Sequence, residues 1–361
     1  MRANLLVGIL TNAVMVSVMP SCADEDRSSL QPVDSSLISF SAVAPKVASR
    51  GDVTTTATIQ NFAVTAYANR KILMDNVNVN RDGSRWTYSP AAYWPDVPVN
   101  FYAISPADIS ASPDITGDGS GTASINKYNN PGNVDLLYAV NYGEIQTAAP
   151  VMINFRHALS KVDVLLSSAN SGIIVKVRSV IIGNVYSQGS FFYPHQTTAA
   201  NNTVSGFWHS QSMIGDVSLY SSPGKSGTLV LTPDPTDVSE SNDGMDIDFF
   251  IPQELGTLSY DVDNKVFTGA YIAVDCEMFD KATGGKLFPG SHTPDYLLVP
   301  GTECGRIMYP ATGGTLTQWK IGYSYVYNIA IDNPSVLFDG IEFDVKVDEF
   351  GDGNISETPS M

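Results

Sequence analysis

The segment that organises the N-terminal half is Leu37-Ile-Ser-Phe-Ser-Ala-Val-Ala44, and its pattern predicts a β-strand. Side chains of a strand point alternately to opposite faces, so Ile38, Phe40 and Ala42 share one apolar face. Residues 53–58 are Val-Thr-Thr-Thr-Ala-Thr, and these β-branched side chains predict a second extended stretch.

Between the two stretches lies Arg50-Gly51, a basic residue followed by a flexible glycine in a polar hinge. Exposed loops with small residues are preferred sites of proteolysis. A cut after Arg50 would release the first strand and leave a gap in its sheet. We therefore interpret Ile38, Phe40 and Ala42 as the core-facing side of a removable strand.

Composition favours an all-β protein rather than a nucleic-acid or membrane-surface binder. Charged residues make up 16% of the 361 residues, with 29 Gly and 21 Pro. The formal net charge of −17 repels nucleic acid and anionic membranes, and it serves solubility. Chain length suggests two domains or one large one.

The first 22 residues have the features of an export signal. Arg2 supplies a positive charge, residues 5–19 form an apolar core, and Ser21-Cys22 follows. The core is too short for a membrane-spanning helix. A cysteine after a small residue at this point predicts a lipoprotein, with Cys22 lipidated after cleavage of residues 1–21. An ordinary secretory signal with a nearby cysteine is the alternative.

Short strands are expected along most of the remaining chain, which predicts sandwiches rather than βαβ units. Asp82-Gly83 is a hairpin signal before a strand at residues 85–88. Residues 105–133 are rich in turn formers and predict a long surface loop. Residues 194–245 are again turn-rich, apart from a strand expected at 228–231. A long β-branched run at 173–182 is expected to break at Gly183-Asn184. Further strands are expected at residues 59–68, 99–104, 135–142, 151–155, 162–165, 245–251, 271–278 and 323–331.

The last predicted strand, residues 341–347, has the strictest alternation. Ile341, Phe343, Val345 and Val347 face one way, and the intervening side chains are charged. Such a terminal strand closes its own sheet or adds to the sheet of another molecule.

No set of residues suggests catalysis, a metal site or a cofactor. The four histidines are scattered, with no carboxylate or cysteine at ligand spacing. Cys276 and Cys304 allow two interpretations, a disulfide in an exported protein or buried free thiols. Aromatic residues between 86 and 102 allow two more, a carbohydrate platform or a sandwich core.

Several motifs, taken in order, resemble the fimbrillin family of Bacteroidales, the subunits of type V pili. They are the signal ending at Cys22, Ile38-Ser-Phe40 with Arg50-Gly51, Arg85-Trp-Thr-Tyr88 with Tyr93-Trp-Pro95 and Val99-Asn-Phe-Tyr102, Phe155-Arg-His-Ala-Leu-Ser-Lys161, and Trp319-Lys-Ile-Gly-Tyr323. Together they span nearly the whole chain.

The resemblance implies two tandem transthyretin-like or immunoglobulin-like β-sandwich domains, and no enzyme. It places a propeptide at residues 22–50, an N-terminal domain at 51–155 and a C-terminal domain at 156–361. It further implies an exported lipoprotein precursor at the outer membrane and cell surface, which an arginine-specific protease trims at Arg50-Gly51. Donor-strand exchange would then fill the gap with a strand from another copy or another pilus subunit, with Ile341, Phe343, Val345 and Val347 as the candidate donor.

Three roles stay open at this point. The chain is a pilus stalk subunit that supports adhesion to a host or bacterial surface receptor, or it is the anchor or tip adhesin of the same system. A surface glycan-binding lipoprotein is the third alternative. The role of a stalk subunit requires the strand at residues 37–44 to occupy a position in a sheet before it is removed. Whether this strand lies in a sheet therefore tests the first role.

Overall fold

A computed structural model describes residues 36–44, 54–107, 115–117, 123–195, 197, 206–222, 228–239, 246–333 and 344–349. Within these ranges the regular structure is β-strand, apart from a single 3-10 turn, η1 (Asp295–Leu297). All of them belong to one compact unit that begins at Ser35. The predicted all-β class is confirmed.

A six-stranded antiparallel sheet and a two-stranded sheet enclose the first core. The order in the larger sheet is β10-β8-β5-β2-β3-β4, and the smaller sheet pairs β1 with β9 in parallel. Their bounds are β1 (Phe40–Val43), β2 (Asn61–Ala68), β3 (Lys71–Asp82), β4 (Arg85–Tyr88), β5 (Val99–Ser105), β8 (Leu137–Glu144), β9 (Val151–Asn154) and β10 (Arg156–His157). Gly83 adopts a φ of 60° at the β3–β4 turn, as the Asp82-Gly83 signal predicts.

A five-stranded sheet and an eight-stranded sheet enclose the second core. One has the order β15-β11-β22-β23, with β16 also paired to β11, and the other has the order β20-β19-β12-β7-β6, with β13, β14 and β21 attached. The strands of the first are β11 (Ser160–Ser167), β15 (Thr236–Asp237), β16 (Phe249–Phe250), β22 (Tyr323–Ala330) and β23 (Asp344–Glu349). The strands of the second are β6 (Ile115–Gly117), β7 (Ala123–Asn129), β12 (Ile173–Phe192), β13 (Phe207–Ser221), β14 (Leu229–Val230), β19 (Tyr271–Asp280), β20 (Lys286–Phe288) and β21 (Gly305–Pro310). A separate hairpin pairs β17 (Ser259–Asp261) with β18 (Val266–Thr268).

The extended stretch predicted at residues 53–58 is wrong, because residues 56–58 form a turn. The backbone N–H of Thr55 donates to Thr58 Oγ1 at 2.7 Å, and the N–H groups of Thr58 and Ile59 both donate to the carbonyl of Thr55. Threonine hydroxyls that bond the local backbone favour turns over strands, and here that preference outweighs β-branching.

The long surface loop predicted at residues 105–133 is also wrong, since β6 and β7 lie within it. Ala123 and Ile125 of β7 are buried, and Lys127 has a φ of 51°, which shifts the alternation so that Tyr128 is buried as well. This irregularity, together with polar neighbours, hides the period of two in the sequence.

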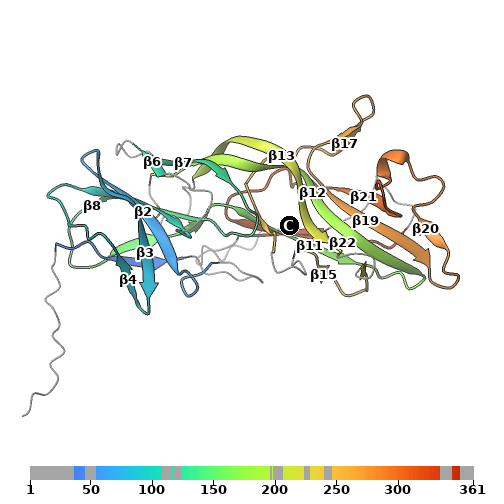
Figure 1. The fold of residues 1–361 in the computed structure, drawn as a ribbon, viewed down its shortest axis with the longest axis horizontal. Helices are drawn as coiled ribbons and strands as arrows, with labels where there is room; N and C mark the ends of the chain where they lie inside the picture. The colour runs from blue at the N-terminus through green and yellow to red at the C-terminus, as the bar shows by residue number, and fades with distance from the viewer. Residues whose placement is uncertain are drawn as a thin grey trace, which may run out of the picture. The chain divides into compact units, whose positions relative to one another are not determined.

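A paired ribbon replaces the turn-rich region predicted after residue 194. β13 pairs with β12 over most of its 15 residues, and the two strands lie side by side in Figure 1. β12 does not break at Gly183-Asn184, because the pair forms a bulge with Asn184 at a φ of 57°. The Asn184 amide donates to the carbonyls of Phe267 and Gly269 and holds the bulge in place.

Candidate functional site

Strand β1 fills a slot in the first sandwich, and one wall of the slot is β9. Phe40 lies opposite Val151 in parallel register, and the pairing continues to Val43 opposite Asn154. The N–H of Val151 donates to the carbonyl of Ser39, and the N–H of Phe155 donates to that of Val43, both at 2.8 Å. Backbone groups on the edge of β9 that faces β1 are therefore hydrogen-bonded to the segment that contains β1.

The segment after β4 forms the opposite wall of the slot. Leu37 and Tyr93 form an antiparallel bridge. The N–H of Ile38 donates to the carbonyl of Ala92 at 3.0 Å, and the N–H of Trp94 donates to the carbonyl of Ser36 at 2.8 Å. The strand is thus hydrogen-bonded along both of its sides, and its loss would leave backbone groups unpaired on both walls.

The inward side chains of this strand are part of the first core. Phe40 is 4% exposed and packs its ring at 5.5–6.0 Å from the rings of Phe62, Tyr88 and Phe101. The buried side chains of the strand are Ile38, Phe40, Ala42 and Ala44. They meet core residues that all come from positions after residue 58.

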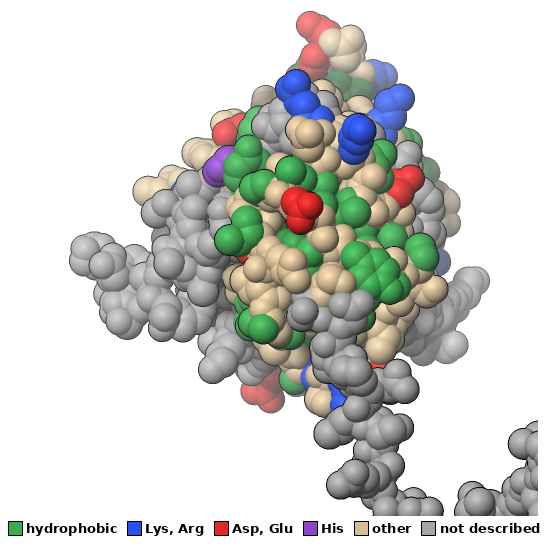
Figure 2. Space-filling model, turned by 90° about the vertical axis from the view of Figure 1, so that its left-hand side faces the viewer, with side chains coloured by type: hydrophobic (Ala, Val, Ile, Leu, Met, Phe, Trp, Pro, Cys, Tyr) green, Lys and Arg blue, Asp and Glu red, His purple; other side chains and the backbone are tan. Residues whose placement is uncertain are grey.

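The outward side of the strand faces solvent. Ser39 and Val43 are exposed and Ser41 is half-buried, so the alternation predicted from the sequence is present. On the face shown in Figure 2, hydrophobic side chains are dispersed among polar ones rather than gathered in one patch. Phe40, the largest side chain of β1, is inside the sandwich.

Two hydroxyl groups hold the ends of the strand by its backbone. Tyr88 donates its hydroxyl to the carbonyl of Ile38 at 2.6 Å. Thr56 Oγ1 accepts from the N–H of Ala44 at 3.0 Å and donates to the carbonyl of Ala44 at 2.8 Å. Burial raises the pKa of Tyr88, which keeps its hydroxyl protonated and able to donate. We call Tyr88 and Thr56 the hydroxyl clamps.

A buried pair anchors the chain just after the hinge. Asp135 Oδ2 accepts from the N–H of Thr54 at 2.7 Å, and its Oδ1 lies 2.8 Å from Nδ1 of His157. The two described residues that flank residues 45–53, Ala44 and Thr54, are therefore both hydrogen-bonded to the folded protein.

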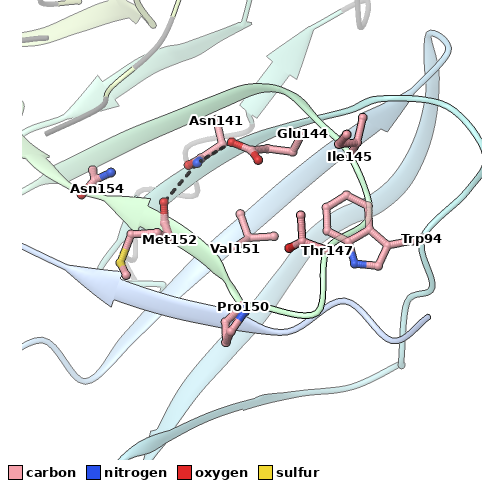
Figure 3. Close-up of a pocket in the computed structure, with 9 residues that line it drawn as sticks. All are labelled: Trp94, Asn141, Glu144, Ile145, Thr147, Pro150, Val151, Met152 and Asn154. Atoms are coloured by element: carbon pink, nitrogen blue, oxygen red, sulfur yellow. Dashed lines mark hydrogen bonds between the residues drawn. The ribbon is translucent and has the colours of Figure 1, made fainter. Parts of the chain in front are cut away.

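A small cavity borders the outer edge of β9 (Figure 3). Its volume is about 290 Å³, and Glu144 is its single titratable side chain. The Asn141 amide donates to the carbonyl of Met152 at 3.0 Å and to Glu144 at 3.1 Å. The Asn141 side chain thus satisfies the Met152 carbonyl, on the edge of β9 that faces away from β1.

The remaining predicted site residues divide into two groups. Cys22, Arg50, Gly51, Ile341 and Phe343 lie outside the described residues. Val345 and Val347 lie on β23, which pairs antiparallel with β22 opposite Tyr327 and Tyr325. β23 is the last strand in the order of its sheet.

The aromatic residues between 86 and 102 pack mostly into the core. Phe101 and Tyr102 are fully buried and Trp94 is 9% exposed. Trp86 packs at 5.0 Å from the Phe62 ring. Tyr93 is the one ring of this set that is largely exposed, at 52%. A continuous ring surface for a sugar is not formed by these side chains, so their arrangement favours the core interpretation.

Cys276 and Cys304 are both buried free thiols. Cys276 on β19 lies opposite Gly305 of β21, so the adjacent Cys304 points toward the other face of the sheet. Burial raises the pKa of both thiols, which makes them unreactive.

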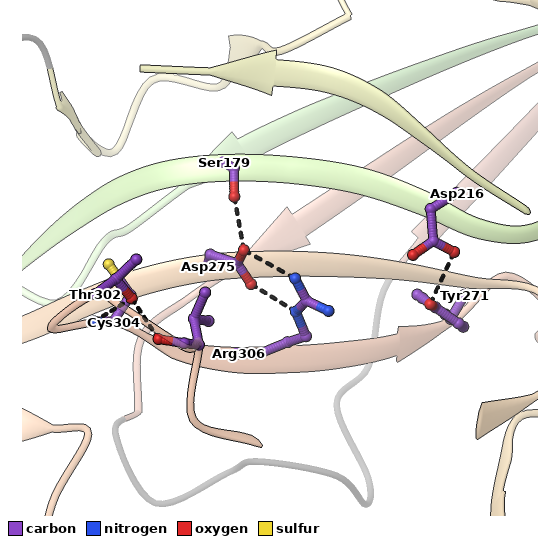
Figure 4. Close-up of polar contacts among 8 residues, drawn as sticks. Ser179, Asp216, Tyr271, Asp275, Thr302, Cys304 and Arg306 are labelled. Atoms are coloured by element: carbon purple, nitrogen blue, oxygen red, sulfur yellow. Dashed lines mark hydrogen bonds and ion pairs between the residues drawn. The ribbon is translucent and has the colours of Figure 1, made fainter. Parts of the chain in front are cut away.

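A polar cluster near these cysteines connects side chains of four strands, β12, β13, β19 and β21 (Figure 4). Arg306 donates two hydrogen bonds to Asp275, at 2.7 and 3.0 Å, and Ser179 donates a third at 2.7 Å. Tyr271 donates to Asp216 at 3.0 Å, and burial raises the pKa of Tyr271 to about 12. Because the Arg306–Asp275 pair is bidentate and fully satisfied, we assign the cluster to stability.

A second charged cluster lies where β11 meets β16. The Lys161 ammonium contacts Asp163, and it lies 3.1 Å from Asp248 Oδ2. Burial raises the pKa of Asp248 to about 6, although the Lys161 charge acts in the opposite direction. We call these three side chains the Lys161 cluster.

Within the described ranges, no group of His, Cys, Asp and Glu side chains is arranged to hold a metal ion. Those ranges also contain no helix that is long and apolar enough to span a bilayer.

The contacts that hold the slot together were not predictable from the sequence. Thr56 belongs to no motif, the motif that contains Tyr88 does not indicate a partner, and their partners lie 12 and 50 residues away. Asp135 and His157 are 22 residues apart, and neither belongs to a known ligand spacing.

Comparison with solved structures finds proteins of similar fold at low identity. A fimbrial protein from Bacteroides vulgatus is 12% identical with a TM-score of 0.48, over 87% of this chain and 99% of that one. A fimbrilin from Porphyromonas gingivalis is 12% identical with a TM-score of 0.42, over 86% and 96% of the two chains. The tip fimbrial protein Mfa3 of the same organism is 8% identical with a TM-score of 0.39, over 81% and 94%.

The comparison with curated proteins returned no match. A family profile described as fimbrillin-like matches residues 46–349, which is most of the chain. This chain therefore belongs to the fimbrillin-like family.

Proposed function

We propose that this chain is a structural subunit of a cell-surface pilus that polymerises by strand exchange after an arginine-specific protease cuts at Arg50-Gly51. Family membership supports a structural, adhesion-related role in a pilus rather than an enzymatic one. The observation that carries the finer proposal is the slot, because a strand upstream of the cut completes a core built from residues downstream of it.

The burial of β1 explains why the uncut chain would stay monomeric. Full burial of a large apolar side chain stabilises the fold by roughly 1.5–3 kcal/mol, and both Ile38 and Phe40 are buried. While the hinge is intact, β1 is held next to its slot, so a strand from another copy competes poorly. Cleavage removes this advantage, and a second copy then competes with a short peptide.

Strand exchange in this geometry produces a filament. The slot and the candidate donor at residues 341–347 are different parts of the chain. The donor of one subunit would therefore bind the slot of the next, which makes each contact head-to-tail. A contact that does not close on itself leaves a free slot or a free donor at every end. Growth continues until a subunit lacks one of the two.

The proposal includes the steps before assembly. Export as a lipoprotein, with the lipid on Cys22, would hold the precursor at the outer membrane until trimming removes residues 22–50. Residues 51–155 and 156–361 would remain as the two β-sandwich domains of the mature subunit. Other copies, other pilus subunits and a surface receptor are the proposed partners.

The first test treats the purified precursor with an arginine-specific protease under native conditions. We expect an amino terminus at Gly51, followed by a ladder of oligomers in native mass spectrometry. R50A is the control, and it is expected to stay monomeric with the same protease. A precursor whose Arg50-Gly51 bond survives, or a trimmed chain that loses β1 and stays monomeric, would contradict the proposal.

A second test separates a stalk subunit from a tip or an anchor. Deletion of residues 341–361 is expected to leave a trimmed chain that accepts a donor but does not extend the fibre. A deleted chain that still extends fibres would show that the donor lies elsewhere. Resistance of the intact chain to trimming would favour an anchor.

A further inference from the structure

The cavity beside β9 brings together polar side chains from three parts of the chain. Asn141 and Glu144 come from β8, Met152 and Asn154 come from β9, and Trp94 comes from the segment after β4. In the view of Figure 3, Trp94 and Asn154 lie at opposite ends, with Asn141 and Glu144 between them. The volume of about 290 Å³ is close to the lower limit of small-molecule pockets, about 300–1,000 Å³, so the cavity suits one small ligand.

Asn141 brings an unpaired hydrogen-bond acceptor to this cavity. The residue is 6% exposed, and its Nδ2 donates to the Met152 carbonyl and to Glu144. Its Oδ1 is buried and has no hydrogen-bond partner among the described residues. A buried acceptor without a partner costs free energy, and a ligand that donates a hydrogen bond would remove this cost.

Glu144 restricts the charge of the ligand. The nine residues that line the cavity include no Lys, Arg or His, so the Glu144 carboxylate has no cation beside it. An anionic ligand would be repelled. A metal ion would find a single carboxylate, and the described part of the chain has no group of side chains arranged to hold one. A carboxylate only accepts hydrogen bonds, so Glu144 also calls for a ligand that donates them.

The two ends of the cavity add donors. Within the described residues, neither the indole N–H of Trp94 nor the side-chain amide of Asn154 forms a hydrogen bond. The indole only donates, and the amide both donates and accepts. An ammonium group has donors alone and would leave these N–H groups unpaired. A hydroxyl group both donates and accepts, so a ligand with several hydroxyl groups matches the whole set.

We propose that this cavity binds one neutral sugar ring. Two of its hydroxyl groups donate to Glu144 and to Asn141 Oδ1, and others accept from Trp94 and Asn154. The site is not the carbohydrate platform considered from the sequence, because Trp94 is the one ring of that set that lines the cavity. The inference goes beyond the proposed function and does not require strand exchange, since the Met152 carbonyl at this cavity lies on the edge of β9 that faces away from β1.

Methyl NMR of the uncut full chain tests the site directly. Met152 lines the cavity and is partly exposed, so its ¹³C-labelled methyl group reports occupancy. Galactose, glucose, mannose and N-acetylglucosamine are titrated one at a time, and at least one is expected to shift the Met152 signal saturably. Met213, exposed on β13, is the control and should not move. M152L and M213L assign the two signals.

Substitutions at the polar groups provide the second measurement. E144Q keeps an oxygen that accepts from Asn141 but removes the charge, and it is expected to raise the dissociation constant of the sugar about tenfold. N154A removes a neutral amide and is expected to raise it several-fold. E303Q is the matched control at an exposed carboxylate outside the cavity, and it should stay within about twofold of the wild type. Thermal unfolding of E144Q and N154A, compared with E303Q, shows whether the variants stay folded.

The outcomes decide between the sugar and its competitors. Saturable binding at Met152 that E144Q or N154A weakens in a folded protein, and that E303Q does not weaken, supports the proposal. A Met152 signal that none of the four sugars shifts overturns it, as does an equal shift of Met213. n-Butylamine serves as the comparison ligand, and tighter binding of this cation than of every sugar would overturn the assignment to hydroxyl groups. All of these measurements use the uncut chain, so none of them bears on whether the trimmed chain forms oligomers.

Discussion

The two largest cores in the described part of the chain differ in where their residues come from along the sequence. The first core includes four side chains from residues 38–44, which precede the predicted cut. The second core begins at Val162 and ends at Ile331, so all of its members follow the cut. Under our proposal, a cut after Arg50 would therefore remove side chains from the first core and none from the second.

The strand pair that contains β1 is shorter than the main strand pair of the second core. β12 has 20 residues and β19 has 10, and they pair with each other over ten positions. β1 has four residues and β9 has four. A short strand pair has fewer ladder bonds to break, which supports our proposal that exchange takes place in the first core.

The largest effect is expected from the side chain that links β1 to the first core. F40A should lower the free energy of unfolding of the first core by about 3–5 kcal/mol, because it leaves a cavity among three rings. Hydrogen exchange followed by mass spectrometry should show lost protection in β2 and β5, with β12 and β19 unchanged. M213A is a control, since Met213 is 64% exposed. Equal loss of protection in both cores would contradict the comparison.

A change in the Lys161 cluster tests the second core in the same way. K161M leaves two buried carboxylates without a cation and should lower the free energy of unfolding by about 3 kcal/mol at pH 7. Protection should now fall in β11 and β16 and stay unchanged in β2. K71M, at an exposed lysine of β3, is the control. A K161M protein as stable as K71M would show that this cluster does not hold the second core.

The pKa of Asp248 predicts a pH dependence of the second core. Its folded-state pKa is about 6 against a usual 3.8, so the folded chain binds this proton more tightly than the unfolded chain does. The contribution of Asp248 to stability therefore falls as pH rises from about 4 to about 6.

Comparison with D248N isolates this contribution. The difference in free energy of unfolding, wild type minus D248N, should decline by on the order of 2 kcal/mol between pH 4 and pH 7. Denaturant titrations at several pH values measure it. A difference that rises with pH over this range would contradict the assigned direction.

The smallest effect concerns the hydroxyl clamps. T56V removes two hydrogen bonds to Ala44 and should lower the stability of the uncut first core by about 1 kcal/mol. In the trimmed chain it should speed the release of residues 36–44 several-fold, as measured by liquid chromatography of the freed peptide. T87V is the matched control, because its exposed hydroxyl makes one long bond of 3.4 Å to Asn80. Identical release rates for the two variants would show that Thr56 does not hold the strand.

Local patterns in the sequence predict the strands whose alternation is regular. Ile38, Phe40 and Ala42 are buried as their spacing predicts, and the Asp82-Gly83 turn closes a hairpin. The predictions fail where backbone irregularity or local hydroxyl bonding competes. Lys127 shifts the phase of β7, and Thr55 and Thr58 form a turn despite their β-branched side chains.

The walls of the slot could not be predicted, because they depend on pairing between distant segments. Nothing near residue 40 specifies that β1 lies parallel to β9 or that Ala92 bonds Ile38 on the other side. Loop closure over such separations depends on the whole fold rather than on a local propensity. A strand near residues 341–347 could be predicted for the opposite reason, because its alternation lies within seven consecutive residues, and β23 covers the described part of it.

The distance between β1 and β9 along the chain also affects the order of folding. Phe40 leaves the ribosome more than a hundred residues before Val151, its partner in the sheet. During that interval the apolar face of residues 38–44 has no sheet to join, and it is open to chaperones or to aggregation. Under our proposal, the segment that keeps the uncut subunit from joining its neighbours is therefore also the segment most exposed to unwanted contacts during synthesis.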